Sequence, residues 1–190
     1  WILADEVYRG AERTQEEETP SFFGRYDKVL AVGSMSKAYG LPGLRVGWVV
    51  GPPSTIEDLW RRHEYTAITA GMISNHLAAH ALSEAVRPRL RDRARNYIKA
   101  GYPILKEWMD SQDGLFSHTP PQASAVTFIK YNLDVNSTAL MEKLCTEASV
   151  FVGAGDSFGM DNHIRIAFGQ SKEVLDEAFS RIEKTLDSLR

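Results

Sequence analysis

The segment from Gly33 to Arg45 brings together residue types that suit phosphate binding. It holds further glycines, the hydroxyls of Ser34 and Ser36, and the amine of Lys37 beside the guanidinium of Arg45. Hydroxyl and guanidinium groups donate hydrogen bonds to a phosphate, and glycines let the backbone approach it. The Gly-x-x-x-x-Gly-Lys-Ser/Thr spacing of a nucleotide-binding loop is absent. The lysine is therefore either a point charge on a phosphate or a nucleophile for a phosphorylated aldehyde cofactor.

Asp5 and Tyr8 favour the interpretation of Lys37 as a nucleophile for such a cofactor. Asp5 ends an apolar run over residues 1–5, and a second apolar run over 28–33 leads into the lysine segment. Both runs are typical of parallel strands, whose carboxyl ends meet at one sheet edge, so Asp5 and Lys37 should lie close together. A pyridoxal cofactor needs a carboxylate beside its ring nitrogen. The phenol of Tyr8, three residues further on, could then bond the 3-oxygen of the ring.

Apolar periodicity and end signals predict the elements that position these residues. The predicted strands cover residues 1–5, 28–33, 45–51, 125–131, 150–152 and 164–168. The predicted helices cover residues 54–65, 73–84, 87–110, 137–148 and 171 to the C-terminus. Ser54 and Glu57 have the spacing of a capping box, Asn136 or Ser137 should cap the fourth helix, and Ser171 the last.

This order of elements predicts an α/β fold: the later part of a mostly parallel three-layer sheet domain in residues 1–100, and a small α+β domain in residues 101–190. The chain opens directly in an apolar run, so we expect it to be the later part of a longer protein. The long helix carries arginines at 87, 89, 91, 93 and 95. We interpret them as a solvated helix face rather than a nucleic-acid patch.

Composition excludes several classes of protein. The net charge of −3 gives no general attraction to nucleic acid or to anionic membranes. Cys145 is the one cysteine, so there is no intrachain disulfide, and we expect a reducing cytoplasm. No apolar run approaches the roughly 20 residues that span a bilayer.

Four motifs in order resemble the fold-type I pyridoxal-phosphate enzymes, specifically class I/II aminotransferases. They are Asp5-Glu6-Val7-Tyr8, Ser34-Met35-Ser36-Lys37 with Arg45 eight residues after the lysine, Ser157-Phe158-Gly159, and Ile164-Arg165-Ile166-Ala167-Phe168-Gly169. The resemblance covers the later half of a family chain. The family's glycine-rich phosphate loop, its ring-stacking aromatic residue and an asparagine at the ring oxygen belong to the preceding half, so we expect the isolated chain to be inactive.

The resemblance implies a role for each matching residue. Lys37 would form a Schiff base with pyridoxal 5′-phosphate and later carry the substrate proton, while Asp5 would keep the pyridine nitrogen protonated. Tyr8 would bond the ring oxygen. Ser34 and Arg45 would bind the phosphate, with Ser36 as a third ligand. Arg165 would clamp the substrate α-carboxylate through paired hydrogen bonds.

The implied reaction moves an amino group from an amino acid to a 2-oxo acid, in a homodimer that binds neither membrane nor nucleic acid. Three alternatives stay open: a lyase or amino-acid cyclase of the same fold, an aminotransferase-like effector domain of a transcription regulator, and a non-catalytic dimerisation scaffold. The stretch Arg62–Thr66 is similar to aminotransferase-like cyclases of arginine-derived antibiotic precursors.

The remaining reactive side chains are expected to be structural. His76 and His80 have i, i+4 spacing without further ligands, so we expect no metal site. Cys145 should be a small buried residue. Trp48, Trp60 and Trp108 are expected in core or helix packing. The segment Tyr65–Thr69 should help to set substrate choice.

Overall fold

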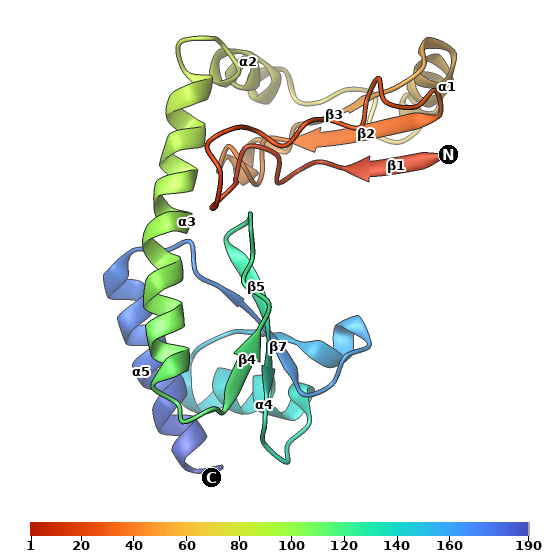
Figure 1. Cartoon of the computed structure of the whole chain (residues 1–190). Coiled ribbons are helices and arrows are strands. Elements are labelled where there is room, and N and C mark those ends of the chain that lie inside the picture. The colour runs from red at the N-terminus through yellow and green to blue at the C-terminus, as the bar shows by residue number, and fades with distance from the viewer. Residues whose placement is uncertain (190) are drawn as a thin grey trace. The chain divides into compact units, whose positions relative to one another are not determined.

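The computed structural model describes residues 1–189 and divides into two compact units, unit 1 (Trp1–Arg95) and unit 2 (Asn96–Arg190). The division falls within helix α3 (Arg87–Asp110), whose bounds agree with the predicted helix (Figure 1). The domains 1–100 and 101–190 stay a prediction. No described helix combines the length and the apolar character needed to cross a membrane.

Unit 1 contains a three-stranded sheet, in the order β1 (Ile2–Asp5), β2 (Val29–Ser34) and β3 (Gly47–Val50). Strands β1 and β2 are parallel, with Asp5 beside Val32, and β3 runs antiparallel to β2. The predicted third strand is therefore too long at its start, because Arg45 adopts a left-handed conformation outside it.

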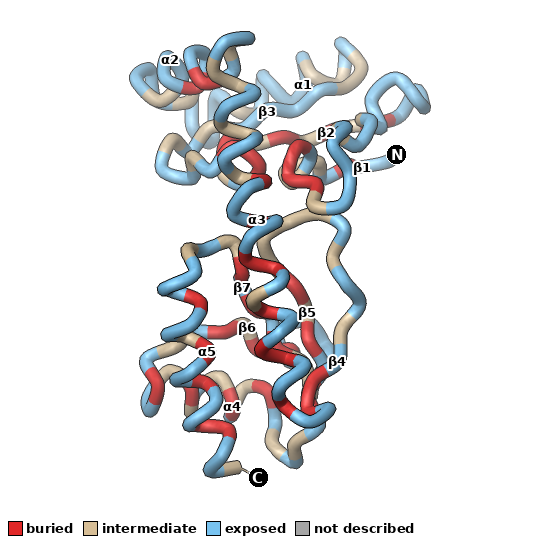
Figure 2. The backbone as a smooth tube through the Cα atoms, turned by 60° about the vertical axis from the view of Figure 1, so that its left-hand side comes forward, coloured by how far each residue is buried: buried red, intermediate tan, exposed pale blue. Residues whose placement is uncertain are grey.

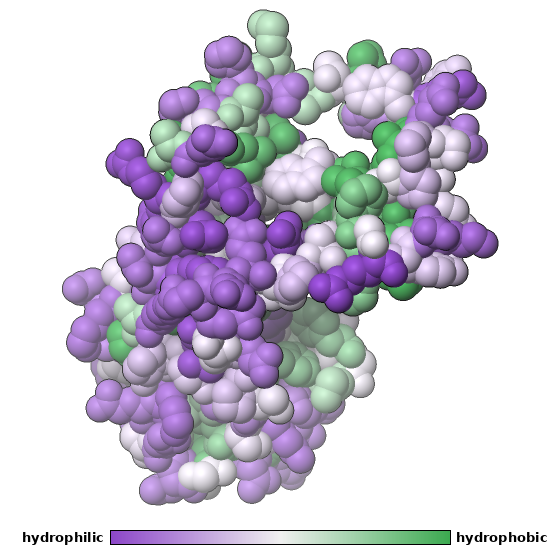
Figure 3. Space-filling view, turned by 45° about the horizontal axis from the view of Figure 1, so that its top comes forward, coloured by the Kyte–Doolittle hydropathy of each residue, from purple (hydrophilic) through white to green (hydrophobic). Residues whose placement is uncertain are grey.

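The first strand forms, but it is not buried as its composition suggested. Ala4, Val29 and Ala31 make a small buried cluster, whereas the side chains of Trp1 and Leu3 are 67% and 71% exposed. Figure 3 shows hydrophobic side chains reaching the surface among polar ones. Strand β1 is an edge strand in this sheet, so one side of its backbone has no neighbouring strand among the described residues.

Three helices complete unit 1 before α3: the 3-10 turn η1 (Pro42–Leu44), α1 (Pro53–His63) and α2 (Met72–Ala81). The predicted capping box at Ser54 is wrong. Helix α1 begins one residue earlier at Pro53, with Pro52 as the N-cap residue and no side-chain capping bond. Proline is well suited to this position because its fixed φ is already helical and it has no N–H to satisfy.

The arginines of α3 do not form a uniformly solvated face, which corrects the prediction. Arg95 is buried and pairs with the buried carboxylate of Glu12, and it also donates to the carbonyl oxygen of Gly10 at 3.0 Å. Burial acts to raise the pKa of Glu12, but hydrogen bonds from Thr19, Gly10 and Arg95 outweigh it and lower the pKa to about 2. The loop that precedes Pro20 is therefore attached to α3 by the ion pair between Glu12 and Arg95.

A second carboxylate in the same loop interacts with three guanidinium groups. Glu18 accepts a hydrogen bond from Arg91 at 3.1 Å, is paired with Arg87, and lies 3.4 Å from Arg9. Burial acts to raise the pKa of Glu18, and the bonds from Arg87 and Arg91 lower it below its ordinary value. Both carboxylates are thus held in the charged form in the folded unit.

Unit 2 contains an antiparallel sheet in the order β4 (Phe116–His118), β5 (Val126–Tyr131), β7 (His163–Ala167) and β6 (Gly153–Ala154). Its helices after α3 are α4 (Ser137–Lys143), the π-helical turn η2 (Leu144–Ala148), the 3-10 turn η3 (Gly155–Phe158) and α5 (Lys172–Asp187). Figure 2 shows buried residues along β4, β5, β7 and the helices α4 and α5.

The core of unit 2 is aromatic and aliphatic. Trp108 stacks on Phe179 with ring centroids 4.6 Å apart, and Leu105 and Phe168 are fully buried. Gly101 allows α3 to approach the end of β7, because a Cβ atom there would lie 1.8 Å from the carbonyl oxygen of Phe168. The backbones of helix and strand end therefore meet directly at this glycine.

Two predicted features of unit 2 differ from the structure. The strand predicted at residues 150–152 is wrong: the short strand β6 lies just after it, and Ser149 takes a left-handed conformation that ends the preceding helix. Strand β4 was not predicted. Asn136 caps α4 as expected, accepting from the amides of Thr138 and Ala139, whereas Ser171 precedes α5 without a side-chain capping bond.

Candidate functional site

Lys37 lies in a tight turn that follows the end of β2. The turn is closed by hydrogen bonds from the amide of Leu41 to the carbonyl oxygen of Met35 at 2.9 Å, and from the amide of Gly40 to the carbonyl oxygen of Lys37 at 3.0 Å. Met35, Ala38 and Tyr39 are buried, whereas Lys37 is exposed. The apolar residues therefore anchor the turn, and the amine is left accessible.

Ser34, Ser36 and Arg45 form a connected cluster beside this turn. The hydroxyl of Ser34 donates to that of Ser36 at 3.0 Å, and the Ser36 amide donates to the Ser34 hydroxyl at the same distance. Arg45 Nη1 donates to Ser36 Oγ at 3.3 Å and to the carbonyl oxygen of Pro42 at 2.9 Å. The left-handed conformation of Arg45, with φ 53°, directs the chain out of η1 into β3.

The donor set of this cluster fits a phosphate group. Both described bonds of Arg45 come from Nη1, so its other nitrogens are available to donate to an oxyanion. Ser34, Ser36 and Arg45 all line a cavity of about 880 Å³ in unit 1. Two hydroxyls and a guanidinium fork at one wall of a cavity are groups that bind phosphate oxygens.

Asp5 lies at the same sheet edge as the lysine turn, and Tyr8 follows it three residues later in the loop after β1. Asp5 ends β1 in register with Val32, two residues before the end of β2. Its Oδ1 accepts from the Val7 amide at 3.2 Å, and the residue is exposed. The amide of Ala38 in turn donates to the Val7 carbonyl at 3.4 Å, which ties the loop after β1 to the lysine turn.

Trp48 lies on the backbone of β2 rather than in the core. A Cβ atom at Gly33 would lie 2.3 Å from the indole ring, so only glycine leaves room for it. The ring of Trp48 is 6.4 Å from that of Tyr39, and Trp48 is 36% exposed. The prediction of core or helix packing is wrong for Trp48, which lies on a strand and is partly exposed. Trp60 lies on helix α1 but is exposed, and Trp108 is buried as expected.

Arg165 belongs to unit 2, where it lies on the exposed face of β7 opposite Phe128 of β5. Its neighbours Ile164 and Ile166 point to the other face and are buried, so strand alternation explains why the guanidinium reaches solvent. The role of Arg165 as a carboxylate clamp stays a prediction.

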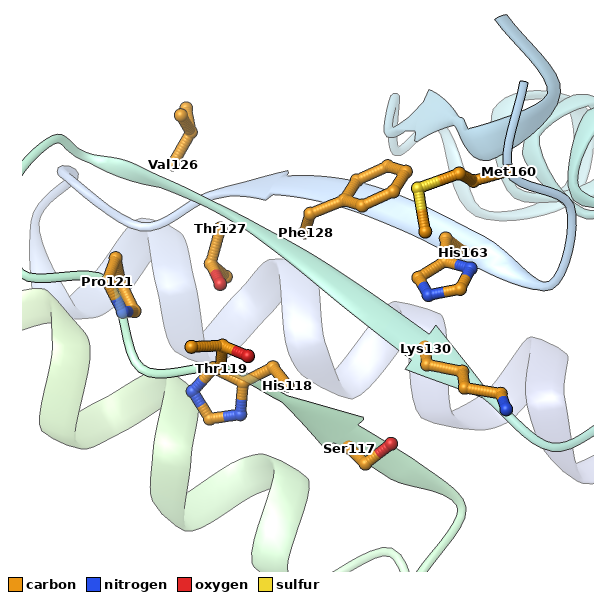
Figure 4. Close-up of a pocket in the computed structure, with 10 residues that line it drawn as sticks. All are labelled: Ser117, His118, Thr119, Pro121, Val126, Thr127, Phe128, Lys130, Met160 and His163. Carbon is orange, nitrogen blue, oxygen red and sulfur yellow. The ribbon is translucent and has the colours of Figure 1, made fainter. Parts of the chain in front are cut away.

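The sheet of unit 2 also bears a cavity of about 600 Å³ (Figure 4). Phe128 lies on one side of it and stacks on the ring of His163, with centroids 5.0 Å apart. Lys130 lines the same cavity. The remaining lining residues mix hydroxyl, apolar and imidazole groups: Ser117, His118, Thr119, Pro121, Val126, Thr127 and Met160.

Contacts from α3 to the lysine turn were not predicted. Arg87 and Arg93 both bond residues that follow Lys37. A signal for part of this arrangement exists in the sequence, because arginines at 87, 91 and 95 recur every four residues and the loop before Pro20 carries several glutamates. Equal spacing on one helix face is also typical of a solvated stripe, so charge pattern alone does not separate the two.

The other reactive side chains form no second site in the part of the chain described. His76 and His80 are exposed on α2, and no group of three possible metal ligands occurs among residues 1–189. Cys145 is half-buried rather than buried, with its sulfur 3.9 Å from that of Met141. Tyr65, in the segment predicted to set substrate choice, is 92% exposed.

Comparison with known proteins gives consistent matches. The family model described as aminotransferase class I and II matches residues 1–182. Capreomycidine synthase of Streptomyces vinaceus is 31% identical over 163 residues, covering 84% of this chain and 41% of that protein. An aspartate aminotransferase of Pyrococcus horikoshii is 27% identical, covering 98% of this chain and 48% of that protein.

A solved structure also matches the whole chain. It is a PLP-dependent aminotransferase from Streptococcus suis, with a TM-score of 0.91 and 30% identity, and the match covers 100% of this chain and 49% of the other. The predicted fold class is confirmed by this similarity. The chain spans about half the length of the relatives that it matches.

Proposed function

Because this chain belongs to the class I and II aminotransferase family, we propose that the protein transfers an amino group from an amino acid to a 2-oxo acid, with pyridoxal 5′-phosphate as cofactor. One observation carries the proposal. The lysine turn, the Ser34–Ser36–Arg45 cluster and the end of β1 with Asp5 lie at one edge of one sheet. Amine, phosphate donors and carboxylate are the groups that this cofactor requires.

The chemistry that the cofactor supplies when bound is an electron sink for negative charge at the substrate carbon. The amine of Lys37 would hold the cofactor covalently and, once released, move the proton at the substrate α-carbon. Ser34, Ser36 and Arg45 would bind the phosphate. Asp5 would hold a proton on the ring nitrogen, because a carboxylate beside that atom stabilises the protonated form.

Two further residues take roles in the proposal. The phenol of Tyr8 follows Asp5 in the loop that contacts the lysine turn, where it would donate to the ring oxygen. The exposed guanidinium of Arg165 would bind the substrate α-carboxylate through two parallel hydrogen bonds, which a guanidinium supplies and a lysine does not. The substrate classes are amino acids and 2-oxo acids.

We further propose a cytoplasmic homodimer. One cysteine in 190 residues fits a reducing compartment. Several large apolar side chains of unit 1, among them Trp1, Leu3 and Trp60, are exposed and would gain stability from burial against another surface. A sedimentation measurement on the protein at its full natural length, across a range of concentrations, tests the dimer.

Covalent trapping tests the cofactor assignment. The protein at its full natural length is incubated with pyridoxal phosphate, reduced with borohydride and digested, and the labelled peptide is identified by mass spectrometry. We expect the label on Lys37 and its loss in Lys37→Ala. Lys28→Ala is the matched control, because Lys28 is an exposed lysine that immediately precedes β2, the strand that leads to the lysine turn. A label distributed over several lysines, or retained in Lys37→Ala, would contradict the proposal.

A second candidate function is an amino-acid cyclase, favoured by the 31% identity to capreomycidine synthase. The two reactions differ in where nitrogen goes. Transamination converts the amino substrate to an oxo acid and consumes a 2-oxo acid such as 2-oxoglutarate, whereas cyclisation keeps the nitrogen in the product. Mass spectrometry of the common amino acids incubated with the protein, with and without 2-oxoglutarate, separates them.

A further inference from the structure

Helix α3 reaches across unit 1 to the turn that carries Lys37. The Nη2 atom of Arg93 donates to the carbonyl oxygen of Tyr39 at 3.0 Å and to that of Gly40 at 3.3 Å. These two carbonyls belong to residues two and three positions beyond Lys37 in the chain. One guanidinium therefore satisfies both acceptors at the end of the lysine turn.

Arg87 holds the same turn through a side chain. Its Nε atom donates to the phenolic oxygen of Tyr39 at 3.1 Å, and its other end is paired with Glu18. Tyr39 is buried, so this bond fixes a side chain that already anchors the turn by packing. Arg87 is in turn held by the carboxylate that also accepts from Arg91.

Gly40 permits the approach of Arg93. Its φ of +62° is rarely adopted by other residues, and a Cβ atom at this position would lie 2.9 Å from Nη2 of Arg93. A side chain at residue 40 would therefore strain the turn and displace the guanidinium. Without Arg93, the segment after Lys37 keeps the two backbone hydrogen bonds that close the turn but loses the bonds to its two carbonyls, and it is more mobile because glycine itself restricts the backbone least.

We propose that Arg93, assisted by Arg87, is a positioning residue for Lys37. It contacts neither the amine nor the phosphate cluster. It fixes the backbone two and three residues after the lysine, so that the amine is presented in one direction toward the cofactor bound at Ser34, Ser36 and Arg45. This inference rests on the proposed function of Lys37 as the residue that binds the cofactor.

The test separates the covalent step from reversible binding, in the protein at its full natural length. The rate of covalent attachment of pyridoxal phosphate to Lys37 reports on presentation of the amine. The affinity for pyridoxine phosphate, which has the ring and phosphate but no aldehyde, reports on the phosphate cluster alone. A purely structural defect weakens both measurements, whereas loss of positioning slows only the first.

We expect Arg93→Ala to slow covalent attachment by about five- to tenfold, the effect of losing one or two hydrogen bonds, with the affinity for pyridoxine phosphate unchanged. Arg93→Lys should recover part of the rate, because an ammonium group can still donate to a carbonyl oxygen but lacks the planar guanidinium that places Nη2 between the two acceptors. Gly40→Ala should slow the step in the same way. The matched control is Arg89→Ala, an exposed arginine on the same helix, which should match the unmodified protein.

Amide exchange gives a readout that needs no cofactor. The amides of Gly40 and Leu41, which close the turn, should exchange about five- to tenfold faster in Arg93→Ala than in Arg89→Ala. If Arg93→Ala does not fold, the attachment rate and the amide exchange are measured in Arg93→Lys and Gly40→Ala instead.

Three results would overturn the inference or its premise. Equal attachment rates in Arg93→Ala and Arg89→Ala would show that the turn positions Lys37 by itself. A parallel loss of pyridoxine phosphate affinity would show a structural role only. Absence of a Lys37 adduct in the unmodified protein would instead remove the proposed function on which the inference rests.

Discussion

In unit 2 the largest buried side chains are aromatic and aliphatic, such as Tyr131, Phe168 and Leu105, whereas in unit 1 the long-range contacts that hold the loop onto α3 are ion pairs. The apolar cluster of the unit 1 sheet is small, comprising Ala4, Val29 and Ala31. The candidate cofactor residues all lie in unit 1, whereas Arg165, the candidate substrate residue, lies in unit 2. The stability of the site should therefore depend on pH and on individual charges, while that of unit 2 should depend on packing volume.

The largest effect is expected from Arg95→Ala. It leaves the carboxylate of Glu12 buried without its guanidinium, and breaking a buried pair from one side costs about 3–5 kcal/mol. Hydrogen exchange should show loss of protection in β1 and β2, with α5 protected as before. Arg89→Ala is the control, because it removes an exposed arginine from the same helix.

The corresponding substitution in unit 2 removes an apolar side chain instead of a charge. Leu105→Ala removes a fully buried side chain in unit 2 and should cost about 2–5 kcal/mol there, with little change in β1 and β2. If Arg95→Ala and Leu105→Ala gave the same pattern of lost protection, the two units would not differ in what holds them.

Acid should weaken unit 1 before unit 2. The folded pKa of Glu12 is about 2 against an ordinary value of 4.5, so its stabilisation is present above the ordinary value and is lost as the pH falls from about 4.5 toward about 2. The shift corresponds to about 3 kcal/mol, and Glu18 acts in the same direction. Hydrogen exchange along an acid series should show β1 and β2 opening first.

Glu12→Gln is the control for the acid series, since an amide does not titrate. Its stability should be lower at neutral pH and flatter with pH than that of the unmodified protein. Simultaneous opening of both units in the unmodified protein would contradict the assignment of this dependence to the Glu12 and Glu18 pairs.

The smallest effect concerns a helix end in unit 2. Asn136→Ala removes the oxygen that accepts from the amides of Thr138 and Ala139, together with the amide group that donates to Asp156 and Asp161, and the lost cap alone should cost about 1 kcal/mol. Ser171→Ala is a matched control at the other N-cap residue, because that side chain makes no capping bond and its loss should cost less. Equal costs in chemical unfolding would show that the capping bond of Asn136 contributes no stability of its own.

Sequence patterns predict well those features that depend on local periodicity. Helix α3 was predicted with its observed bounds because its apolar residues recur at helical spacing, and the lysine turn was found from residue types clustered after a strand. The burial of Arg95 was missed because its partner Glu12 lies far away in the chain. The spacing of arginines is the same whether water or a folded loop covers them.

Other prediction errors concern elements that are too short to show a periodicity, or sequence motifs that lie beside a stronger signal for the same helix end. Strand β4 has only three residues, so alternation does not identify it. The predicted capping box at Ser54 does not form, because the helix already begins at Pro53, one residue before Ser54. The predicted roles of Asp5, Tyr8 and Arg165 depend on bound cofactor and substrate, which no local pattern places.

Gly101 has a consequence for the variation that this chain tolerates. A Cβ atom at this position would lie 1.8 Å from the Phe168 carbonyl oxygen, which is a backbone atom and cannot rotate aside as the end of a flexible side chain could. Every other amino acid carries that atom. A mutation that replaces Gly101 by any other amino acid should thus be lost through misfolding of unit 2 before any change in its chemistry could be selected.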